Sequence, residues 1–338
     1  RSPTPAAERT GAVARIGVFG AGAWGTALSI VAARAGHEVV LVARDPAAVL
    51  AMRTHRRNER RLPGIELPEA VRPSADPSEL GGVALLLLAV PTQTLRRALA
   101  ALPEALPPLL LCCKGLELGS GLRPSEVVAE LRPAAVVGAL SGPSFAQEVA
   151  RGLPTAVSLA FPDRATALRA AGLLAQPGFR PYPTDDLVGV ELGGALKNVI
   201  AIAAGIVVGK GLGENARAAL VTRGLAEIAR LAEACGARRT TLMGLSGLGD
   251  LVLTATSLTS RNTSLGFALG LGRPPAELAA EGAPLAEGIF TAEAACARAA
   301  GLGLELPITD AVRRVVAGTT SIEAAIEELL ARPLPESE

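Results

Sequence analysis

Residues 15–25 read RIGVFGAGAWG, and this stretch decides the fold. Its first five residues form a short apolar run typical of a buried strand, and Gly20, Gly22 and Gly25 then make a GxGxxG pattern. The first glycine permits a tight turn, the second lets the backbone approach a pyrophosphate, and the third lets helix and strand pack closely. Because the pattern stands between a predicted strand and a predicted helix, it indicates a dinucleotide site in preference to an ordinary glycine turn.

The first half of the chain alternates short apolar runs with segments of helical character. The runs that we expect to be parallel strands are residues 15–19, 38–43, 83–90, 109–113 and 135–140. The helical segments between them are residues 26–35, 46–57, 92–101 and 124–131. This order predicts an α/β domain with a Rossmann-type doubly wound sheet over residues 15–186. A further strand, helix and strand are expected at the sheet edge, at residues 155–160, 164–174 and 179–182.

Strand patterns disappear after residue 186. The helices that we expect there cover residues 188–208, 215–235, 263–271, 292–300, 307–317 and 321–332. The first of them is apolar nearly all round, which marks a central, buried helix. We therefore predict an all-helical second domain over residues 187–332, with loose tails at residues 1–14 and 333–338.

Composition narrows the function classes. The chain has 338 residues, 49% of them hydrophobic, as expected for a globular protein with two packed domains. Its 33 basic and 32 acidic side chains give a net charge of +1, which argues against a nucleic-acid partner. The longest apolar runs, residues 83–90 and 199–208, are shorter than a bilayer span, and the polar start is unlike a secretory signal. We expect a cytoplasmic protein without a membrane span.

Histidine and cysteine are scarce. The chain has two histidines and four cysteines, with neither a CxxC pair nor an HExxH motif. A structural zinc site or a Ser-His-Asp hydrolase is therefore not expected, and no metal is assigned. We expect the cysteines to be reduced thiols.

The basic residues are strongly biased, because 30 of the 33 are arginine. The three lysines are Lys114, Lys197 and Lys210. A desolvated lysine can lose its proton and act as a base, whereas arginine stays protonated. The three lysines are therefore candidates for acid–base chemistry, unless they remain by chance.

The residues at the end of the second predicted strand indicate whether the chain prefers NAD or NADP. An acidic residue there would bind the ribose 2′-hydroxyl of NAD, but the chain has Ala43-Arg44-Asp45. Arg44 suits the 2′-phosphate of NADP, and Asp45 could soften that preference. NADP(H) is favoured and NAD(H) stays open, as does the alternative that Arg44 is an ordinary solvated arginine.

Further motifs follow in the order CKGLE at 113–117, LSGPSFA at 140–146, ELGGALKN at 191–198, GLSGLGD at 244–250 and SRN at 260–262. Together with residues 20–27 they resemble the bacterial-type NAD(P)-dependent glycerol-3-phosphate dehydrogenases, over about residues 15–307. The chain differs from the usual pattern at Cys113, where the family commonly has threonine, and at Leu285, where valine is common.

The resemblance implies reversible reduction of dihydroxyacetone phosphate to sn-glycerol 3-phosphate, for glycerophospholipid synthesis, with Lys197 as catalytic proton donor or acceptor. The substrate contacts that it implies, Lys197 among them, are Lys114, Gly142, Ser144, Lys197, Asp250, Ser260, Arg261 and Asn262. The cofactor contacts, which add to the three loop glycines, are Ala23, Trp24, Arg44, Lys114, Ala146, Arg261, Leu285 and Glu287.

The chemistry of Lys197 agrees with this role. The apolar stretch 192–208 should lower its pKa by desolvation, and Lys114 would lower it further if both point into one site. Asp250 would oppose both effects and could fix the direction of the side chain. The alternative is a lysine that snorkels from a helix surface.

The residues Ser260-Arg261-Asn262 suit a phosphate group. Arg261 can bind phosphate bidentately, while its neighbours and the start of a helix near Thr263 add donors. The alternative is a polar helix cap. Gly142 and Ser144 follow a predicted strand, at the end where such sheets bind ligands.

Two other functions stay open. One is a related enzyme that acts on a hydroxy acid or a sugar acid, which would have no need of a phosphate site. The other is an NADP-binding sensor without catalysis, against which Lys197 and Asp250 argue. We also expect a homodimer formed through the apolar helical domain.

Overall fold

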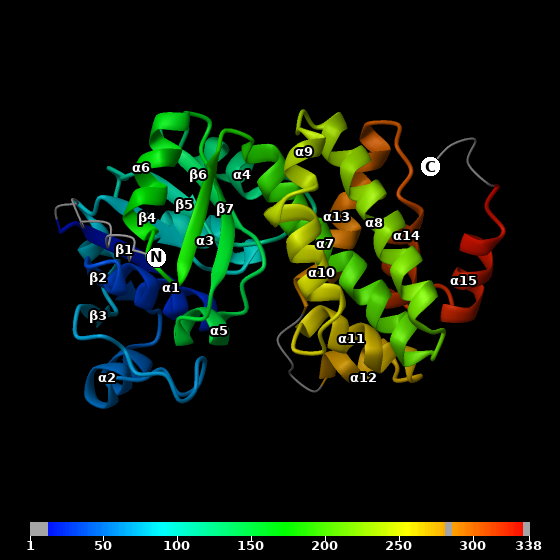
Figure 1. Cartoon of the computed structure of the whole chain (residues 1–338), viewed down its shortest axis with the longest axis horizontal. Helices are drawn as coiled ribbons and strands as arrows, with labels where there is room; N and C mark the ends of the chain where they lie inside the picture. Colours follow the sequence, from blue (N-terminus) through cyan, green and yellow to red (C-terminus); the bar gives the residue numbers. More distant parts are fainter. Residues whose placement is uncertain (1–12, 281–285, 334–338) are drawn as a thin grey trace, which may run out of the picture.

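The computed structural model describes residues 13–280 and 286–333. A sheet covered by helices forms one part, and a bundle of helices forms the other (Figure 1). The expected fold class, a doubly wound sheet followed by a helical domain, is confirmed. Helix α7 (Leu187–Gly209) begins the helical part, and in Figure 1 its label stands among those of α8, α10 and α13.

The sheet has eight strands in the order β3-β2-β1-β4-β5-β6-β7-β8. Their bounds are β1 Arg15–Phe19, β2 Glu38–Val42, β3 Val71–Ser74, β4 Leu85–Leu88, β5 Leu109–Leu111, β6 Val137–Ser141, β7 Thr155–Ala160 and β8 Phe179–Thr184. Strands β1 to β6 run parallel, while β7 is antiparallel to β6 and parallel to β8. The strand order reverses between β1 and β4, which is where sheets of this kind bind ligands.

Helices cover both faces of the sheet, and this explains the continuous apolar runs of its strands. In β2, Val39 and Leu41 belong to one hydrophobic core, while Val40 and Val42 belong to a core on the opposite face. The helices of this part are α1 Ala23–Arg34, α2 Pro46–His55, η1 Pro77–Leu80, η2 Thr92–Thr94, α3 Leu95–Ala100, α4 Pro124–Leu131, α5 Ala146–Arg151 and α6 Arg164–Leu174.

The structure differs from the prediction in several elements. The short helices that were not expected are η1, α5, α9 (Arg239–Leu242), η3 (Leu245–Gly249), α10 (Asp250–Ala255) and α12 (Pro275–Ala280). Two further differences have a clear physical reason. Strand β3 has the sequence VRPS, which contains no apolar run and was therefore missed. Its Pro73 is tolerated because β3 is the edge strand of the sheet. Helix α1 begins at Ala23, three residues earlier than expected, because Gly22 serves as its N-cap.

The helical part is built around α7. The other helices are α8 Glu214–Ala234, α9 Arg239–Leu242, η3 Leu245–Gly249, α10 Asp250–Ala255, α11 Arg261–Gly270, α12 Pro275–Ala280, α13 Glu287–Gly301, α14 Pro307–Val316 and α15 Ile322–Leu330. By length and composition α7 could cross a membrane, but 89% of its apolar window is buried inside the protein. It is the core helix that the sequence predicts.

Helices α7 and α11 meet backbone to backbone through glycines four residues apart. A methyl group on Gly205 would lie 2.2 Å from the Thr263 carbonyl oxygen, and one on Gly266 would lie 1.9 Å from the Ile202 carbonyl oxygen. Gly209 and Gly270 continue the same contact. The glycines thus allow an approach that any side chain would prevent, and they hold the start of α11 against α7.

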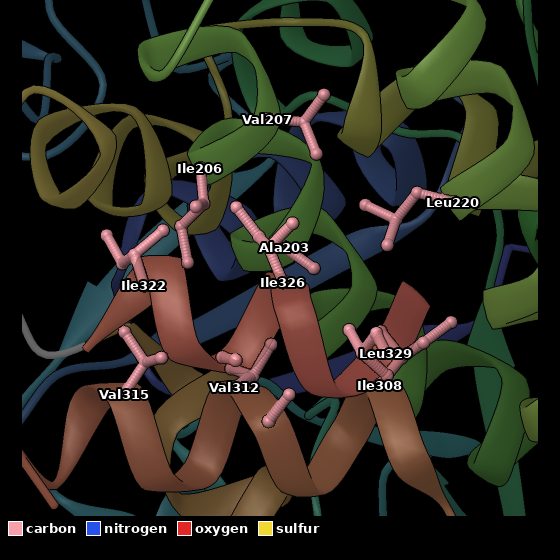
Figure 2. A pocket seen from close by; sticks show the side chains of 12 residues that line it. Ala203, Ile206, Val207, Leu220, Ile308, Val312, Val315, Ile322, Ile326 and Leu329 are labelled. Carbon is pink, nitrogen blue, oxygen red and sulfur yellow. The ribbon is translucent and has the colours of Figure 1, made fainter. Parts of the chain in front are cut away.

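A cavity of about 60 Å³ lies between α7, α8, α14 and α15 (Figure 2). Alanine, isoleucine, valine and leucine side chains line it, among them Ile206, Val312 and Leu329. Its volume is far below that of ordinary ligand sites, and its apolar lining offers nothing to bind a phosphate. The cavity is a packing feature of the C-terminal helices.

We predict that Gly266→Ala destabilises the protein by about 1–3 kcal/mol, because the added methyl group forces α11 away from α7. Urea unfolding followed by circular dichroism measures the change. The matched control is Gly172→Ala in α6, where a methyl group meets no atom within 4 Å. The free energy of unfolding of this control should be higher than that of the unchanged protein by about 0.5–1 kcal/mol. Equal stability of the two variants would contradict the close helix contact.

Candidate active site

The glycine-rich loop lies between β1 and α1, beside the point where the strand order reverses. Gly20 has a φ of +111°, and a methyl group on Gly25 would lie 1.9 Å from the Gly20 carbonyl oxygen, so the fold itself requires both glycines. Gly22 is different, because a methyl group there would meet no atom within 4 Å. The free space beside Gly22, at the start of α1, therefore fits a pyrophosphate.

Two residues expected at the cofactor have buried polar atoms without a hydrogen-bond partner in the part of the chain that the structure describes. These atoms are Trp24 Nε1 and Glu287 Oε2. Trp24 lies in the first turn of α1, directly after the glycine-rich turn, and Glu287 begins α13. Buried polar atoms normally find partners, so both atoms fit a bound polar molecule such as a nicotinamide cofactor.

The remaining predicted cofactor positions are distributed around the sheet. Ala23 begins α1, and Ala146 begins α5. Leu285 lies outside the described residues. Burial raises the pKa of the Glu287 carboxyl, against a hydrogen bond from the Thr92 backbone N–H and the charge of Arg261.

Arg44 lies just beyond the end of β2, and its side chain is exposed. No partner for it is found among residues 13–280 and 286–333. The neighbouring Asp45 is the N-cap of α2 and accepts a hydrogen bond from the Ala47 N–H at 3.0 Å. Because the Asp45 carboxylate is already engaged as a cap, Arg44 is the charged group here that can meet an adenosine phosphate.

Lys114, Lys197 and Asp250 form one charge cluster. Lys197 Nζ lies 2.5 Å from Asp250 Oδ1, and Lys114 Nζ lies 2.7 Å from Asp250 Oδ2. Lys114 follows β5 in the sheet part, whereas the other two belong to α7 and α10 of the helical part. The structure thus joins the lysine and aspartate of three separate motifs, with two positive charges on one buried carboxylate.

The charges of this cluster are perturbed by burial and by one another. Burial lowers the pKa of Lys197 to about 8, with Asp250 acting to raise it and Lys114 to lower it further. Burial opposes the charge on Asp250, but the two lysines outweigh that effect and lower its pKa. A lysine with a pKa near neutrality can both donate and accept a proton.

Two further members of the cluster were missed by sequence reasoning. Thr254 Oγ1 accepts a hydrogen bond from Lys197 Nζ at 2.7 Å, and Ser141 Oγ lies 3.5 Å from Asp250 Oδ2. Thr254 stands four residues after Asp250 on α10, so both side chains project from one helix face. That spacing could have identified Thr254.

A π-helical turn, η3, immediately precedes Asp250. Gly247 makes the turn possible, because a methyl group there would lie 2.0 Å from the Leu242 carbonyl oxygen. Gly193 of α7 packs on the same turn, against the Ser246 carbonyl, and Gly194 packs against the Ser141 hydroxyl. These glycines therefore let α7 approach both the sheet and η3, which brings Lys197 to Asp250.

The loop after β6 closes the cluster on the sheet side. The Gly142 carbonyl accepts hydrogen bonds from Lys114 Nζ at 3.2 Å and from the Ser144 hydroxyl at 2.8 Å. Gly142 has a φ of +146°, and a methyl group there would lie 2.9 Å from Val157 Cα. Both predicted residues therefore lie beside Lys114.

Ser260, Arg261 and Asn262 form the start of α11, and they differ in exposure. Ser260 is the N-cap and accepts from the Thr263 N–H, as the alternative interpretation of a polar cap predicts. Asn262 is buried between α7 and α13, where its amide binds Asn198 Oδ1 and the Gly288 N–H. Arg261 is exposed and has its guanidinium available for an anion.

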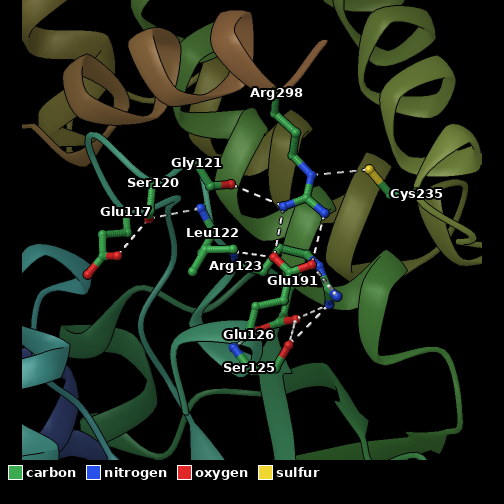
Figure 3. Close-up of polar contacts among 10 residues, drawn as sticks. All are labelled: Glu117, Ser120, Gly121, Leu122, Arg123, Ser125, Glu126, Glu191, Cys235 and Arg298. Atoms are coloured by element: carbon green, nitrogen blue, oxygen red, sulfur yellow. Dashed lines mark hydrogen bonds and ion pairs between the residues drawn. The ribbon is translucent and has the colours of Figure 1, made fainter. Parts of the chain in front are cut away.

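A partly buried ionic network ties the sheet part to the helical part (Figure 3). Arg123 Nη1 lies 2.6 Å from Glu191 Oε2 of α7, and Arg298 of α13 makes a bidentate pair with Glu126 of α4. Burial opposes the charge of Glu126, but Arg298 and the Arg123 N–H outweigh it and lower its pKa to about 2. The loop from Lys114 to Arg123 is thus attached to the helical part at both ends.

The four cysteines are free thiols. Burial raises the pKa of Cys113 to about 12, and the charges of Glu191 and Glu287 act in the same direction. Cys113 is therefore a neutral side chain beside Lys114, in keeping with its place where the family has threonine. Within the described ranges no group of three or more His, Cys, Asp or Glu residues is suited to a metal ion.

The fold, the glycine-rich loop and the buried lysine define a two-part nicotinamide-dependent oxidoreductase. Residues 15–167 match the family model for the N-terminus of NAD-dependent glycerol-3-phosphate dehydrogenase, and residues 186–327 match the model for its C-terminus. The chain therefore belongs to the NAD-dependent glycerol-3-phosphate dehydrogenase family, and it is an NAD(P)-dependent enzyme.

Individual relatives agree with the family models. The chain is 53% identical to a glycerol-3-phosphate dehydrogenase (NAD(P)+) of Methylobacterium radiotolerans, over 94% of this chain and 97% of the relative. It is 50% identical to the enzyme of the same name from Caulobacter vibrioides, over 95% and 98% of the two chains. The crystal structure of glycerol-3-phosphate dehydrogenase from Coxiella burnetii is similar with a TM-score of 0.88 and 39% identity, covering 95% of this chain and 99% of that one.

We predict that Gly22→Ala leaves the melting temperature nearly unchanged but weakens cofactor binding about tenfold or more. The methyl group meets no atom of the protein, yet it occupies the space that fits the pyrophosphate. Calorimetric titration with NADPH and thermal unfolding measure the two effects. Gly25→Ala, in contrast, should lower the melting temperature, because its methyl group collides with the Gly20 carbonyl. Full NADPH affinity in the Gly22 variant would disprove the assignment of this loop.

Proposed function

We propose that this chain reduces dihydroxyacetone phosphate to sn-glycerol 3-phosphate reversibly, with Lys197 as the proton donor and acceptor. The observation that carries the proposal is the buried Lys197 ammonium group, bonded to Asp250 at 2.5 Å and to Thr254 at 2.7 Å. A group with a pKa of about 8 in this position suits proton exchange with a C2 oxygen. Family membership supports the same reaction.

The residues of the protein position the proton donor and stabilise the negative charge that develops on the substrate oxygen. The reduced cofactor, when bound, supplies a hydride to the C2 carbonyl carbon. Lys197 Nζ gives its proton to the resulting alkoxide oxygen, so that the ketone gains one hydride and one proton. Asp250 and Thr254 aim Lys197, and Lys114 adds a second positive charge beside the developing negative one. In the reverse direction the neutral Lys197 amine takes up the hydroxyl proton.

The substrate phosphate is assigned to the start of α11. Arg261 supplies an exposed guanidinium, and the first N–H groups of this ten-residue helix supply further donors. Ser260 already binds the Thr263 N–H of its own helix, and Asn262 binds Asn198 of α7. These two residues therefore hold this end of α11 in place as well as facing the substrate. Gly142 and Ser144 border the substrate beside Lys114.

The cofactor is assigned to the glycine-rich loop and the residues around it. NADP(H) is the preferred form, because Arg44 is available for a 2′-phosphate and Asp45 is engaged as a helix cap. The residues that would hold the cofactor, with Leu285 outside the described ranges, are Gly20, Gly22, Ala23, Trp24, Gly25, Arg44, Lys114, Ala146, Arg261, Leu285 and Glu287.

The biological setting is part of the same proposal. We assign the enzyme to the cytoplasm, where its product would supply glycerophospholipid synthesis. We also propose a homodimer formed through the apolar helical part. Light scattering at micromolar concentration tests the dimer, and the mass of a single chain there would disprove it.

The deciding experiment measures oxidation of NADPH and of NADH with dihydroxyacetone phosphate, beside unphosphorylated dihydroxyacetone. Turnover restricted to the phosphate ester is the expected result. Turnover with unphosphorylated hydroxy or oxo acids would favour the related reductases instead, and cofactor binding without any turnover would favour a sensor.

Lys197→Ala should abolish turnover while it leaves NADPH binding largely intact.

The pH dependence follows from the pKa of Lys197, which lies at about 8. Its ammonium form predominates below that pH and its amine form above it. We therefore expect kcat/KM for reduction to fall about tenfold per pH unit above the pKa, and kcat/KM for oxidation to fall in the same way below it. Initial rates in both directions between about pH 6 and pH 10 measure the two limbs. Flat profiles in both directions would contradict the role of Lys197.

Cofactor preference is expected to depend on Arg44. Arg44→Ser should raise KM for NADPH about 10- to 100-fold, because a charge-assisted contact to the 2′-phosphate is lost, and should leave KM for NADH nearly unchanged. The control is Arg169→Ser, an exposed arginine of α6. An equal rise of KM for NADPH and for NADH would show that Arg44 does not bind the 2′-phosphate.

A further inference from the structure

Asn58 is a buried side chain that directly touches the glycine-rich loop. It lies in the loop after α2, and 6% of it is exposed. Its Nδ2 group donates hydrogen bonds to the Ala21 carbonyl at 3.0 Å and to Thr26 Oγ1 at 2.8 Å. Ala21 belongs to the glycine-rich turn and Thr26 to the first turn of α1, so one amide joins the turn to the helix that follows.

The Ala21 carbonyl lies outside the helical hydrogen-bond pattern. The first bond of that pattern runs from the Thr26 N–H to the Gly22 carbonyl at 2.9 Å. The Ala21 carbonyl therefore takes its hydrogen bond from Asn58. A backbone carbonyl in this position needs a partner, and a side chain 37 residues away supplies it.

This contact determines the direction of a cofactor-facing group. The Ala21 carbonyl and the Gly22 N–H belong to one planar trans peptide, so they point in opposite directions. By holding the carbonyl, Asn58 turns the Gly22 N–H away from itself. Gly22 is the residue with free space beside it, where the pyrophosphate would lie.

Asn58 is itself held in place by its backbone. Its carbonyl accepts from the Arg61 N–H at 3.0 Å and from the Leu62 N–H at 2.8 Å, and Leu62 is buried in the core under the sheet. The amide is thus anchored before any ligand arrives, as an effective positioning group must be.

We propose that Asn58 is a positioning residue of the cofactor site, which fixes the glycine-rich loop so that the Gly22 N–H faces the pyrophosphate. The inference rests on the proposed function only in taking this loop as the dinucleotide site. Asn58 acts through Ala21 and Thr26 and does not itself touch the cofactor.

The variants that test it are Asn58→Ala and Asn58→Asp. Aspartate has the same shape, but its carboxylate has no hydrogen to donate to the Ala21 carbonyl. We expect the NADPH dissociation constant to rise at least about tenfold in the alanine variant, the cost of losing a hydrogen bond to a buried partner. It should rise further in the aspartate variant, which adds a negative charge close to the pyrophosphate. Asn215→Ala, at an exposed position of α8, is the control.

Trp24 gives a readout that is independent of catalysis. It is the single tryptophan of the chain and lies in the first turn of α1, directly after the glycine-rich turn, so selectively excited tryptophan emission reports on this end of α1. We expect both Asn58 variants to shift the Trp24 emission before any cofactor is added, and to require more NADPH for the change on binding. KM for dihydroxyacetone phosphate at saturating NADPH should stay within about twofold of the unchanged enzyme.

A purely structural role predicts different results. A lower melting temperature with an unchanged NADPH dissociation constant and an unshifted Trp24 emission would overturn the proposal. If the Asn58 variants do not fold, Thr26→Val removes one of the two amide contacts with little change of shape, and it should shift the Trp24 emission and raise the dissociation constant. No NADPH or NADH binding by the unchanged chain would overturn the proposed function and this inference together, whereas normal binding by the variants overturns this inference alone.

Discussion

The structure depends on one buried carboxylate that two lysines share. Asp250 is 1% exposed and contacts Lys197 of the helical part and Lys114 of the sheet part. A buried charge is tolerated only when opposite charges and hydrogen bonds compensate it, and removal of one partner typically costs several kcal/mol. The placement of the two parts relative to each other is therefore coupled to the charge balance of the candidate active site. The network of Arg123 and Glu191 adds a second connection between the same two parts.

Close backbone contacts make this charge cluster geometrically possible. Gly194 lets α7 approach Ser141 of the sheet, Gly193 lets it approach the π-helical turn, and Gly205 lets it approach α11. Each contact brings a different set of polar groups toward the buried face of α7. A helix that is almost wholly apolar can therefore carry a buried, charged lysine, since the compensating groups come from neighbouring elements.

Local signals in the sequence were sufficient for the fold class, and they also singled out the two lysines and the aspartate that the structure brings together. The GxGxxG pattern predicts the turn after β1, and the bias toward arginine draws attention to Lys114 and Lys197. The missed features depend on contacts between distant residues or lack a periodic signal. Asn58 lies 37 residues from Ala21, and no local pattern indicates that contact, whereas Thr254 has a local signal in its four-residue spacing from Asp250. The π-helical turn before Asp250 has no hydrophobic period that could predict it.

The pKa of Lys197 explains why the proposed proton transfer needs a lysine in a chain that otherwise uses arginine. Burial and the Lys114 charge lower the pKa, Asp250 raises it, and the balance lies at about 8. Arginine in the same place would remain protonated, because its pKa exceeds that of lysine by at least about two units. Asp250 has two effects that cannot be separated, since the contact that aims the ammonium group also keeps its pKa from falling further. The proposed role, in which the site gives a proton in one direction and takes it in the other, needs such opposing contributions, and a lysine is the basic side chain that can respond to them.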